Sequence, residues 1–167
     1  MTEAQILFAC QKDHCYFKLI GELRYTNASG MDDLLERLFQ QQQQPLCGQV
    51  VVDITEVTFI DSTHIGLLAS LARHCQQHKL PRPLLFSRDD EIEHLLRGLC
   101  LDQVFDFAAQ PRVQHTELTE VEPAAYQDQQ QGQMILRAHQ ALLDLSDKNR
   151  AEFQSVVDLL KQQLPED

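Results

Sequence analysis

The sequence predicts one α/β domain, a mixed β-sheet packed against helices, followed by a C-terminal helical hairpin. Two observations support this fold class. Apolar, β-branched runs alternate along the chain with segments whose apolar residues recur every three to four positions. The chain has 167 residues, which is enough for one domain of ordinary size and an appendage.

The first elements are predicted to be a hairpin, a helix and a buried strand. Two aromatic-rich apolar runs, residues 5–10 and 15–20, are separated by a polar segment, which is typical of a hairpin. Residues 31–39 carry apolar side chains with helical spacing, after N-cap candidates at residues 26–29. Residues 49–54 are rich in β-branched side chains, which indicates a strand covered on both faces.

The next elements complete the predicted sheet. A loop of about seven residues is expected after the buried strand, and an amphipathic helix begins at Ser62. Residues 83–87 predict a strand, and residues 104–107 a last strand. Between them, Ser87 and Asp90 resemble the capping arrangement of a short helix that carries Ile92, Leu95, Leu96 and Leu99. The predicted order is therefore strand, strand, helix, strand, helix, strand, helix, strand.

The chain is predicted to divide into three parts. Residues 1–110 hold the α/β domain, residues 111–132 form a polar, glutamine-rich linker, and residues 133–164 form a C-terminal helical extension with two apolar stripes. Asn149 and Glu152 are the predicted capping pair of its second helix. We expect the two helices to pack on each other or back on the sheet.

Composition excludes several classes of protein. There are 25 acidic and 14 basic residues, for a net charge of -11, so we expect neither a nucleic-acid nor a membrane partner. No apolar run is long enough to span a bilayer, and the first residues lack the basic flank of a signal peptide. The five cysteines form no C-x-x-C pair and are expected to be reduced. These features indicate a cytoplasmic protein that binds another protein and needs no cofactor.

The chemistry is expected in the stretch Phe-Ile-Asp-Ser-Thr-His-Ile-Gly at residues 59–66. Ser62 falls at or beside a helix N-cap, where backbone N–H groups lack partners and the helix dipole favours negative charge. A phosphate there would add about 1.5 to 2 negative charges beside Asp61 and change the surface without changing the fold. The ordinary interpretation of an Asp-Ser pair before a helix is capping alone. These residues alone do not decide between phosphorylation of Ser62 and helix capping.

Residues 51–66 resemble the signature of STAS domains of the anti-sigma factor antagonist class. In that family a buried strand ending in Asp leads to Asp-Ser-(Ser/Thr) and a helix that contains small residues. Residues 19–23 resemble the early Gly-x-Leu segment of the family, and the element order over residues 5–108 is similar. His64 stands where many members have Gly or another small residue. With its extension after residue 110, the chain resembles the longer proteobacterial members of the family, which act in partner-switching pathways.

The resemblance implies a STAS-like fold and a non-enzymatic switch. The unphosphorylated protein would bind an anti-sigma factor and would be released when a cognate serine kinase phosphorylates Ser62; a phosphatase, which could be part of a response regulator, would reverse this. Asp61 would position the hydroxyl and cap the helix, Thr63 would flank the docking surface, and Asp53 would orient the loop. Alternatively, Asp53 only satisfies N–H groups of the loop at the end of the strand. The residues implied in partner binding are Asp53, Asp61, Ser62, Thr63, His64 and Gly66.

Three other interpretations of the sequence exist. The same fold serves as a subunit of ABC transporter complexes, and such a subunit would need no kinase. A serine hydrolase would use Ser62 as its nucleophile, although the glycines of a G-x-S-x-G elbow are missing. His74 and His78 share one helix face and could hold a metal, but no further ligand is evident and no metal site is expected.

Overall fold

The structure is a computed structural model that describes residues 3–11, 14–40, 48–108 and 117–164. A six-stranded sheet with the strand order β5-β4-β3-β2-β1-β6 forms its centre. The strands are β1 (Gln5–Cys10), β2 (His14–Leu23), β3 (Gln49–Ile60), β4 (Leu84–Phe86), β5 (Asp106–Ala108) and β6 (Thr119–Glu120). β1 is antiparallel to both of its neighbours, and β2 to β5 are parallel. The sheet is mixed, as predicted.

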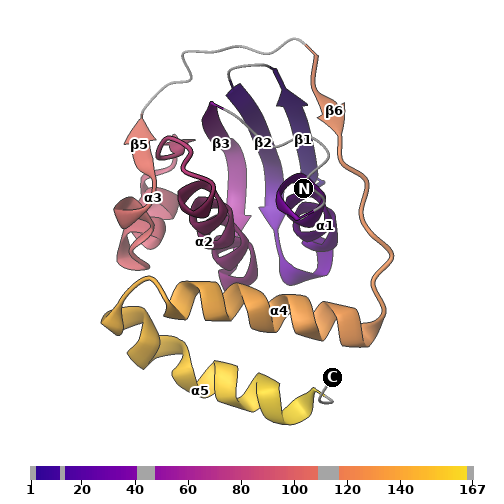
Figure 1. Ribbon diagram of the computed structural model, residues 1–167, viewed down its shortest axis with the longest axis vertical. Coiled ribbons are helices and arrows are strands. Elements are labelled where there is room, and N and C mark those ends of the chain that lie inside the picture. Colours follow the sequence, from indigo (N-terminus) through magenta and orange to yellow (C-terminus); the bar gives the residue numbers. More distant parts are fainter. Residues whose placement is uncertain (1–2, 12–13, 41–47, 109–116, 165–167) are drawn as a thin grey trace.

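The helices cover one face and one end of this sheet. They are α1 (Ser29–Phe39), α2 (Ser62–Gln77), α3 (Asp90–Gly98), α4 (Asp128–Leu143) and α5 (Asp147–Gln163), with short 3-10 turns η1 (Tyr25–Asn27) and η2 (Leu101–Gln103). In Figure 1, α1 to α3 lie in front of the sheet, α4 crosses below α1 and α2, and α5 lies farthest out. Crossovers between parallel strands need a helix or long loop, which explains the helical layer.

One hydrophobic core connects the domain and its extension. Phe17 of β2, Leu71 of α2 and Leu85 of β4 are fully buried between the sheet and the helices. Met134 and Leu142 of α4 are fully buried in the same cluster. The extension therefore packs back on the domain, as expected, through α4.

The strand before Ser62 is longer than predicted. β3 has 12 residues and continues to Ile60, which pairs with Leu23 of β2. The expected loop after residue 54 is therefore wrong. The polar residues that suggested it remain in the ladder because β2 continues beside them, with an irregularity near Gly21, whose φ is 89°. A positive φ is readily adopted by glycine.

The range predicted as a linker contains regular structure. β6 lies within it and pairs with β1, and α4 begins inside it at Asp128. Gln127 and Gln130 form a capping box at the start of α4, so the glutamine run helps to start a helix. Residues 111–116 lie outside the described part of the chain.

The corner between α4 and α5 is tied to the end of α3. The side chain of Ser146 caps α5 by accepting a hydrogen bond from the Asn149 N–H, so the predicted Asn149–Glu152 capping pair is wrong. The fully buried Asn149 side chain instead donates to the carbonyls of Leu99, at 2.8 Å, and Leu142, at 2.9 Å.

Two cysteines depart from the expected reduced state. Cys10 and Cys15 are joined by a disulfide. They are partners across the β1–β2 hairpin, so the register of the strands brings their side chains together. Cys75 and Cys100 are free thiols, and Cys47 lies outside the described residues.

Candidate functional site

Asp61 holds the N-terminus of α2. Its Oδ1 accepts a hydrogen bond from the His64 N–H at 3.0 Å, and its Oδ2 accepts one from the Tyr25 N–H at 2.6 Å. Its own N–H donates to the Leu23 carbonyl at 3.0 Å. Asp61 is thus the N-cap of α2, as predicted, and it also joins α2 to the turn that follows β2.

Ser62 is the first residue of α2, and its hydroxyl contacts the C-terminal extension. Its Oγ lies 2.9 Å from Nε2 of His139 on α4. The other ring nitrogen of His139, Nδ1, lies 2.8 Å from the Ile135 carbonyl. A carbonyl only accepts, so Nδ1 carries a proton, and in the neutral ring Nε2 accepts from the Ser62 hydroxyl. The candidate hydroxyl is therefore engaged by α4.

His64 has a structural role inside the domain. Its side chain is 1% exposed, and its Nε2 lies 2.9 Å from Oδ1 of Asn27. The same Oδ1 accepts from the Arg24 N–H, so His64 is the donor in this pair. Burial lowers the pKa of His64 to about 4, and the ring is neutral at physiological pH.

Two more predicted partner-binding residues are buried. Thr63 is 3% exposed. Gly66 is buried beneath α4, where a Cβ atom would lie 2.2 Å from the carbonyl oxygen of Ala138. With α4 in this position, Thr63, His64 and Gly66 offer little surface to another protein.

Asp53 lies apart from Ser62, in the middle of β3. It accepts hydrogen bonds from the Tyr16 hydroxyl and from the Thr55 N–H and hydroxyl, the last two at 2.9 and 2.6 Å. Burial and this contact with Asp53 raise the pKa of Tyr16. About 26 Å of extended chain separates Asp53 from Asp61, at about 3.3 Å per residue. No loop follows Asp53 directly, because β3 continues to Ile60.

Two exposed aromatic side chains beside Asp61 were not predicted from the sequence. Tyr25 is 49% exposed and Phe59 is 39% exposed. The guanidinium of Arg24 lies 4.2 Å from the centre of the Phe59 ring, a cation–π distance. We call Arg24, Tyr25 and Phe59 the aromatic ridge. The sequence shows the Phe in the signature stretch, but its exposure depends on the tertiary structure around it.

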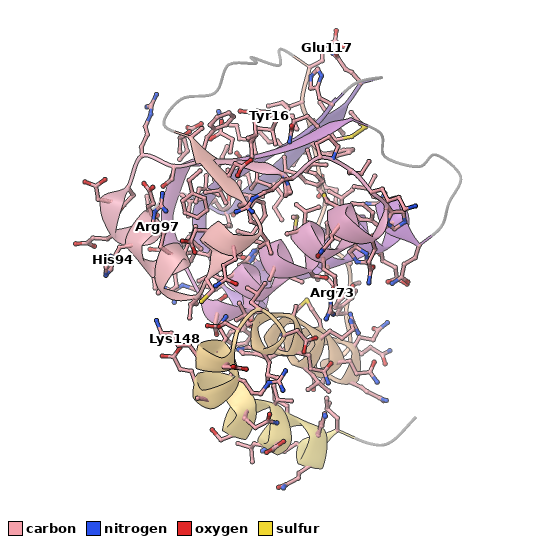
Figure 2. The ribbon with its side chains drawn as sticks, turned by 60° about the vertical axis from the view of Figure 1, so that its left-hand side comes forward. Tyr16, Arg73, His94, Arg97, Glu117 and Lys148 are labelled. Atoms are coloured by element: carbon pink, nitrogen blue, oxygen red, sulfur yellow. A yellow bond between two sulfur atoms is a disulfide. The ribbon has the colours of Figure 1, made fainter. Side chains whose placement is uncertain are left out.

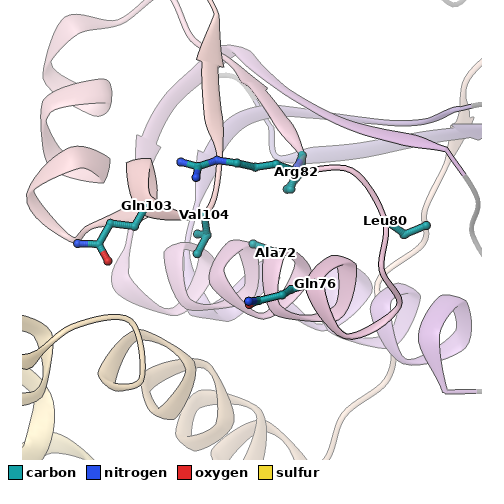
Figure 3. A pocket seen from close by; sticks show the side chains of 7 residues that line it. Ala72, Gln76, Leu80, Arg82, Gln103 and Val104 are labelled. Carbon is teal, nitrogen blue, oxygen red and sulfur yellow. The ribbon is translucent and has the colours of Figure 1, made fainter.

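A cavity of about 220 Å³ lies elsewhere on α2, near its second half (Figure 3). It is lined by Ala72, Gln76, Leu80, Arg82, Pro83, Gln103 and Val104. The Arg82 guanidinium is occupied by Asp106, at 3.0 Å, and by backbone carbonyls. Neither Ser62 nor His139 is among the lining residues, so this cavity is separate from Ser62.

His74 and His78, the candidate metal-binding pair, make other contacts in the structure. His78 Nδ1 contacts the His74 carbonyl at 2.9 Å, and the His74 ring stacks on Phe39. Within the described residues, no group of three or more His, Cys, Asp or Glu side chains could hold a metal ion. No helix in the same part of the chain is long and apolar enough to cross a bilayer.

Comparison with known proteins identifies the family. The STAS domain model matches residues 5–119, and the chain belongs to the STAS-domain family, whose members are typically non-catalytic. Among solved structures, the chain is similar to the anti-sigma factor antagonist SpoIIAA in its unphosphorylated form. The TM-score is 0.51 and the identity 15%, over 64% of this chain and 90% of that chain. At this identity the likeness shows the fold alone. No curated protein matches the chain.

Proposed function

We propose that this protein is an anti-sigma factor antagonist of a partner-switching pathway. It binds an anti-sigma factor when Ser62 is unmodified, and phosphorylation of Ser62 by a cognate serine kinase releases it. A phosphatase restores the binding form. The observation that carries the proposal is the position of Ser62 as the first residue of α2, directly after the N-cap Asp61 and beside the aromatic ridge.

This position explains how a phosphate would act. The N-terminus of a 16-residue helix favours an anion through its dipole and its free N–H groups. The phosphate adds about 1.5 to 2 negative charges next to Asp61, so a partner that fits the neutral hydroxyl meets a strongly charged surface. The fold can stay unchanged.

The aromatic ridge supplies the apolar part of the proposed docking surface. Exposed aromatic and arginine side chains are enriched where proteins bind one another. The Tyr25 N–H donates to Asp61, so the ridge is tied to the residue that precedes Ser62. We therefore place partner binding on Arg24, Tyr25, Phe59, Asp61 and Ser62. With α4 in its observed position, the other predicted residues, Asp53, Thr63, His64 and Gly66, are buried.

A serine hydrolase is the second candidate because of one observation. Ser62, His139 and the Ile135 carbonyl form a hydroxyl, a base and an orienting acceptor within hydrogen-bond distance, as in covalent catalysis. The His64 N–H is already bonded to Asp61 and is not free to stabilise an oxyanion. We expect no covalent labelling of Ser62 by a fluorophosphonate probe, and labelling of the folded protein would favour the hydrolase.

The switch is tested with the tagged full chain in its native cells. We expect mass spectrometry to find phosphate on Ser62. We expect an anti-sigma factor to copurify with Ser62→Ala and to be lost, by at least about tenfold, with Ser62→Asp. Ser155→Ala and Ser155→Asp, at an exposed serine of α5, are the matched controls. Phosphate only at other residues, or equal binding by the two Ser62 variants, contradicts the proposal. Copurification of an ABC ATPase with both Ser62 variants would favour the transporter-subunit alternative.

The docking surface is tested separately. We expect Phe59→Ala to weaken binding of the copurified partner by about tenfold, because an exposed aromatic anchor is removed. Leu159→Ala on α5 is the control, since Leu159 is also a large exposed apolar residue, at 54% exposure. An equal loss with both variants would mean that the aromatic ridge is not the docking surface.

A further inference from the structure

α4 lies along the face of α2 that begins with Ser62. Three contacts follow α2 from its first turn to its fourth: Ser62 with His139, Gly66 with Ala138, and Arg73 with Asp144. Figure 2 shows Arg73 between α2 and the C-terminal helices. The first of these contacts lies on the turn that carries the candidate phosphorylation site.

The middle contact brings the two helices unusually close. Ala138 is 1% exposed. A side chain at position 66 would meet the backbone of Ala138, and the nearest distances, 2.2 Å to its oxygen and 2.6 Å to its carbonyl carbon, leave no room for it. Gly66 therefore allows α4 to lie directly against α2, which places the His139 ring on the Ser62 hydroxyl one turn away.

The segment leading into α4 is anchored to α1. The Ser29 hydroxyl donates to the Ala124 carbonyl at 2.9 Å and its Oγ accepts from the Ala124 N–H at 3.1 Å. Asp32 accepts from the Tyr126 hydroxyl at 2.6 Å and from Arg137 at 2.9 Å. These contacts hold the N-terminal end of α4 in place.

The other end of α4 is anchored to α3. Asn149 bonds the Leu99 carbonyl, and the Lys148 ammonium bonds the Gly98 carbonyl at 2.7 Å. The thiol of Cys100 lies 3.3 Å from the Ser146 hydroxyl. With both ends held, α4 cannot rise from Ser62 unless one of these anchors opens.

The C-terminal helices are nevertheless an addition to a complete domain. The match to the STAS family ends at residue 119, before α4 begins. α5 is loosely covered, since Val157 is 2% exposed but Val156 is 38% and Leu159 is 54% exposed. A helix with few buried contacts can open while the rest of a protein stays folded. α5 is such a helix, whereas opening of α4 also exposes Met134 and Leu142, which are buried in the core.

We propose that α4, braced by α5, is a lid over Ser62. With the lid closed, the hydroxyl is bonded to His139 and α4 covers the approach to it, so neither a kinase nor a docked partner reaches the serine. With the lid open, the α2 face becomes accessible. This inference rests on the proposed function and adds a regulation to it: opening of the C-terminal helices precedes the switch.

The lid is tested without a kinase, by labelling a thiol at position 62. The full chain with Ser62→Cys is treated with a polyethylene-glycol maleimide, and modification of residue 62 is followed by peptide mass spectrometry. Ala138→Arg wedges a large side chain between α4 and α2, whereas Ala151→Arg places the same side chain on exposed α5. We expect labelling at least about tenfold faster with Ala138→Arg than with Ala151→Arg or with neither. Equal rates in the folded proteins overturn the lid.

If the Ala138→Arg variant does not fold, the lid is tested with a reversible engineered disulfide. Ser146→Cys places a second thiol beside Cys100, and their disulfide ties the end of α4 to the domain. We expect residue 62 to be labelled more slowly in the oxidised protein than after reduction. Equal rates overturn the lid.

The two proposals fail in different ways. Absence of phosphate on Ser62 in cells refutes the proposed function, whatever the maleimide rates are. Equal maleimide rates refute the lid and leave a phosphorylated Ser62 untouched. If both proposals hold, Ala138→Arg with Ser62 intact carries more phosphate in cells than Ala151→Arg.

Discussion

The two sides of the α2 N-terminus are built differently. On one side, Asp61 and His64 join α2 to residues 25–27, and all of these residues lie within the STAS domain. On the other side, Ser62 contacts His139, which lies 77 positions further along the chain. The domain side determines where the serine lies. The added side determines what can reach it.

The two histidines show the same division. His64 donates through Nε2 to Asn27, because Asn27 presents an oxygen there. His139 accepts through Nε2 in its neutral form, because its Nδ1 proton is directed to the Ile135 carbonyl. His64 is a buried donor within the domain, so its hydrogen bond does not depend on α4. His139 lies on α4, so its hydrogen bond to the Ser62 hydroxyl is lost when α4 moves.

The largest predicted effect is a loss of folding stability at low pH, and it concerns His64 on the domain side of the α2 N-terminus. The pKa of His64 falls from 6.5 to about 4 on folding because the ring is buried. The unfolded chain therefore binds the proton first, and the protein loses stability as the pH falls from about 6.5 to about 4. We expect a loss of up to about 3 kcal/mol from this group, measured by urea unfolding at pH 7 and at pH 4.5.

His64→Gln is the matched variant because an amide still donates towards Asn27. We expect it to unfold with a weaker dependence on pH over the same window. If the difference in unfolding free energy between the two pH values is unchanged in His64→Gln, other groups carry the acid sensitivity.

A medium effect is expected from the N-cap. Asp61→Ala removes the acceptor of the His64 and Tyr25 N–H groups, and such caps contribute about 0.5 to 2 kcal/mol. We expect a loss of stability in this range by urea unfolding. Asp61→Asn, which keeps an acceptor oxygen, should lose less. Equal losses in the two variants would show that the charge of Asp61, and not capping, stabilises the site.

The smallest effect is expected on the lid side. Arg73 and Asp144 form an ion pair with side chains 48% and 44% exposed, and such pairs contribute about 0 to 1 kcal/mol. Asp144→Arg should raise hydrogen exchange of α4 amides and leave β3 unchanged. Arg73→Asp in the same chain should restore protection. Equal acceleration in β3 would mean that α4 does not open as a separate unit.

Local patterns predicted the parts of the fold that depend on neighbours in the chain. Helical spacing and a preceding Asp placed the start of α2 correctly, because a cap acts over three residues. The same reasoning ended β3 too early, because pairing with β2 kept its polar second half extended. β6 has two residues, too few to leave a recognisable pattern.

The sequence by itself determined the class of fold, the Asp-Ser pair at the head of α2 and the apolar stripes of the C-terminal helices, because periodicity and capping act over a few residues. Only the tertiary structure decided that Asp53 and His64 are internal, that Tyr25 and Phe59 are exposed, and that His139 contacts Ser62. These outcomes depend on which surfaces of distant elements meet. The close approach of Gly66 and Ala138 is such a meeting, and it turns the C-terminal extension into a cover for the serine.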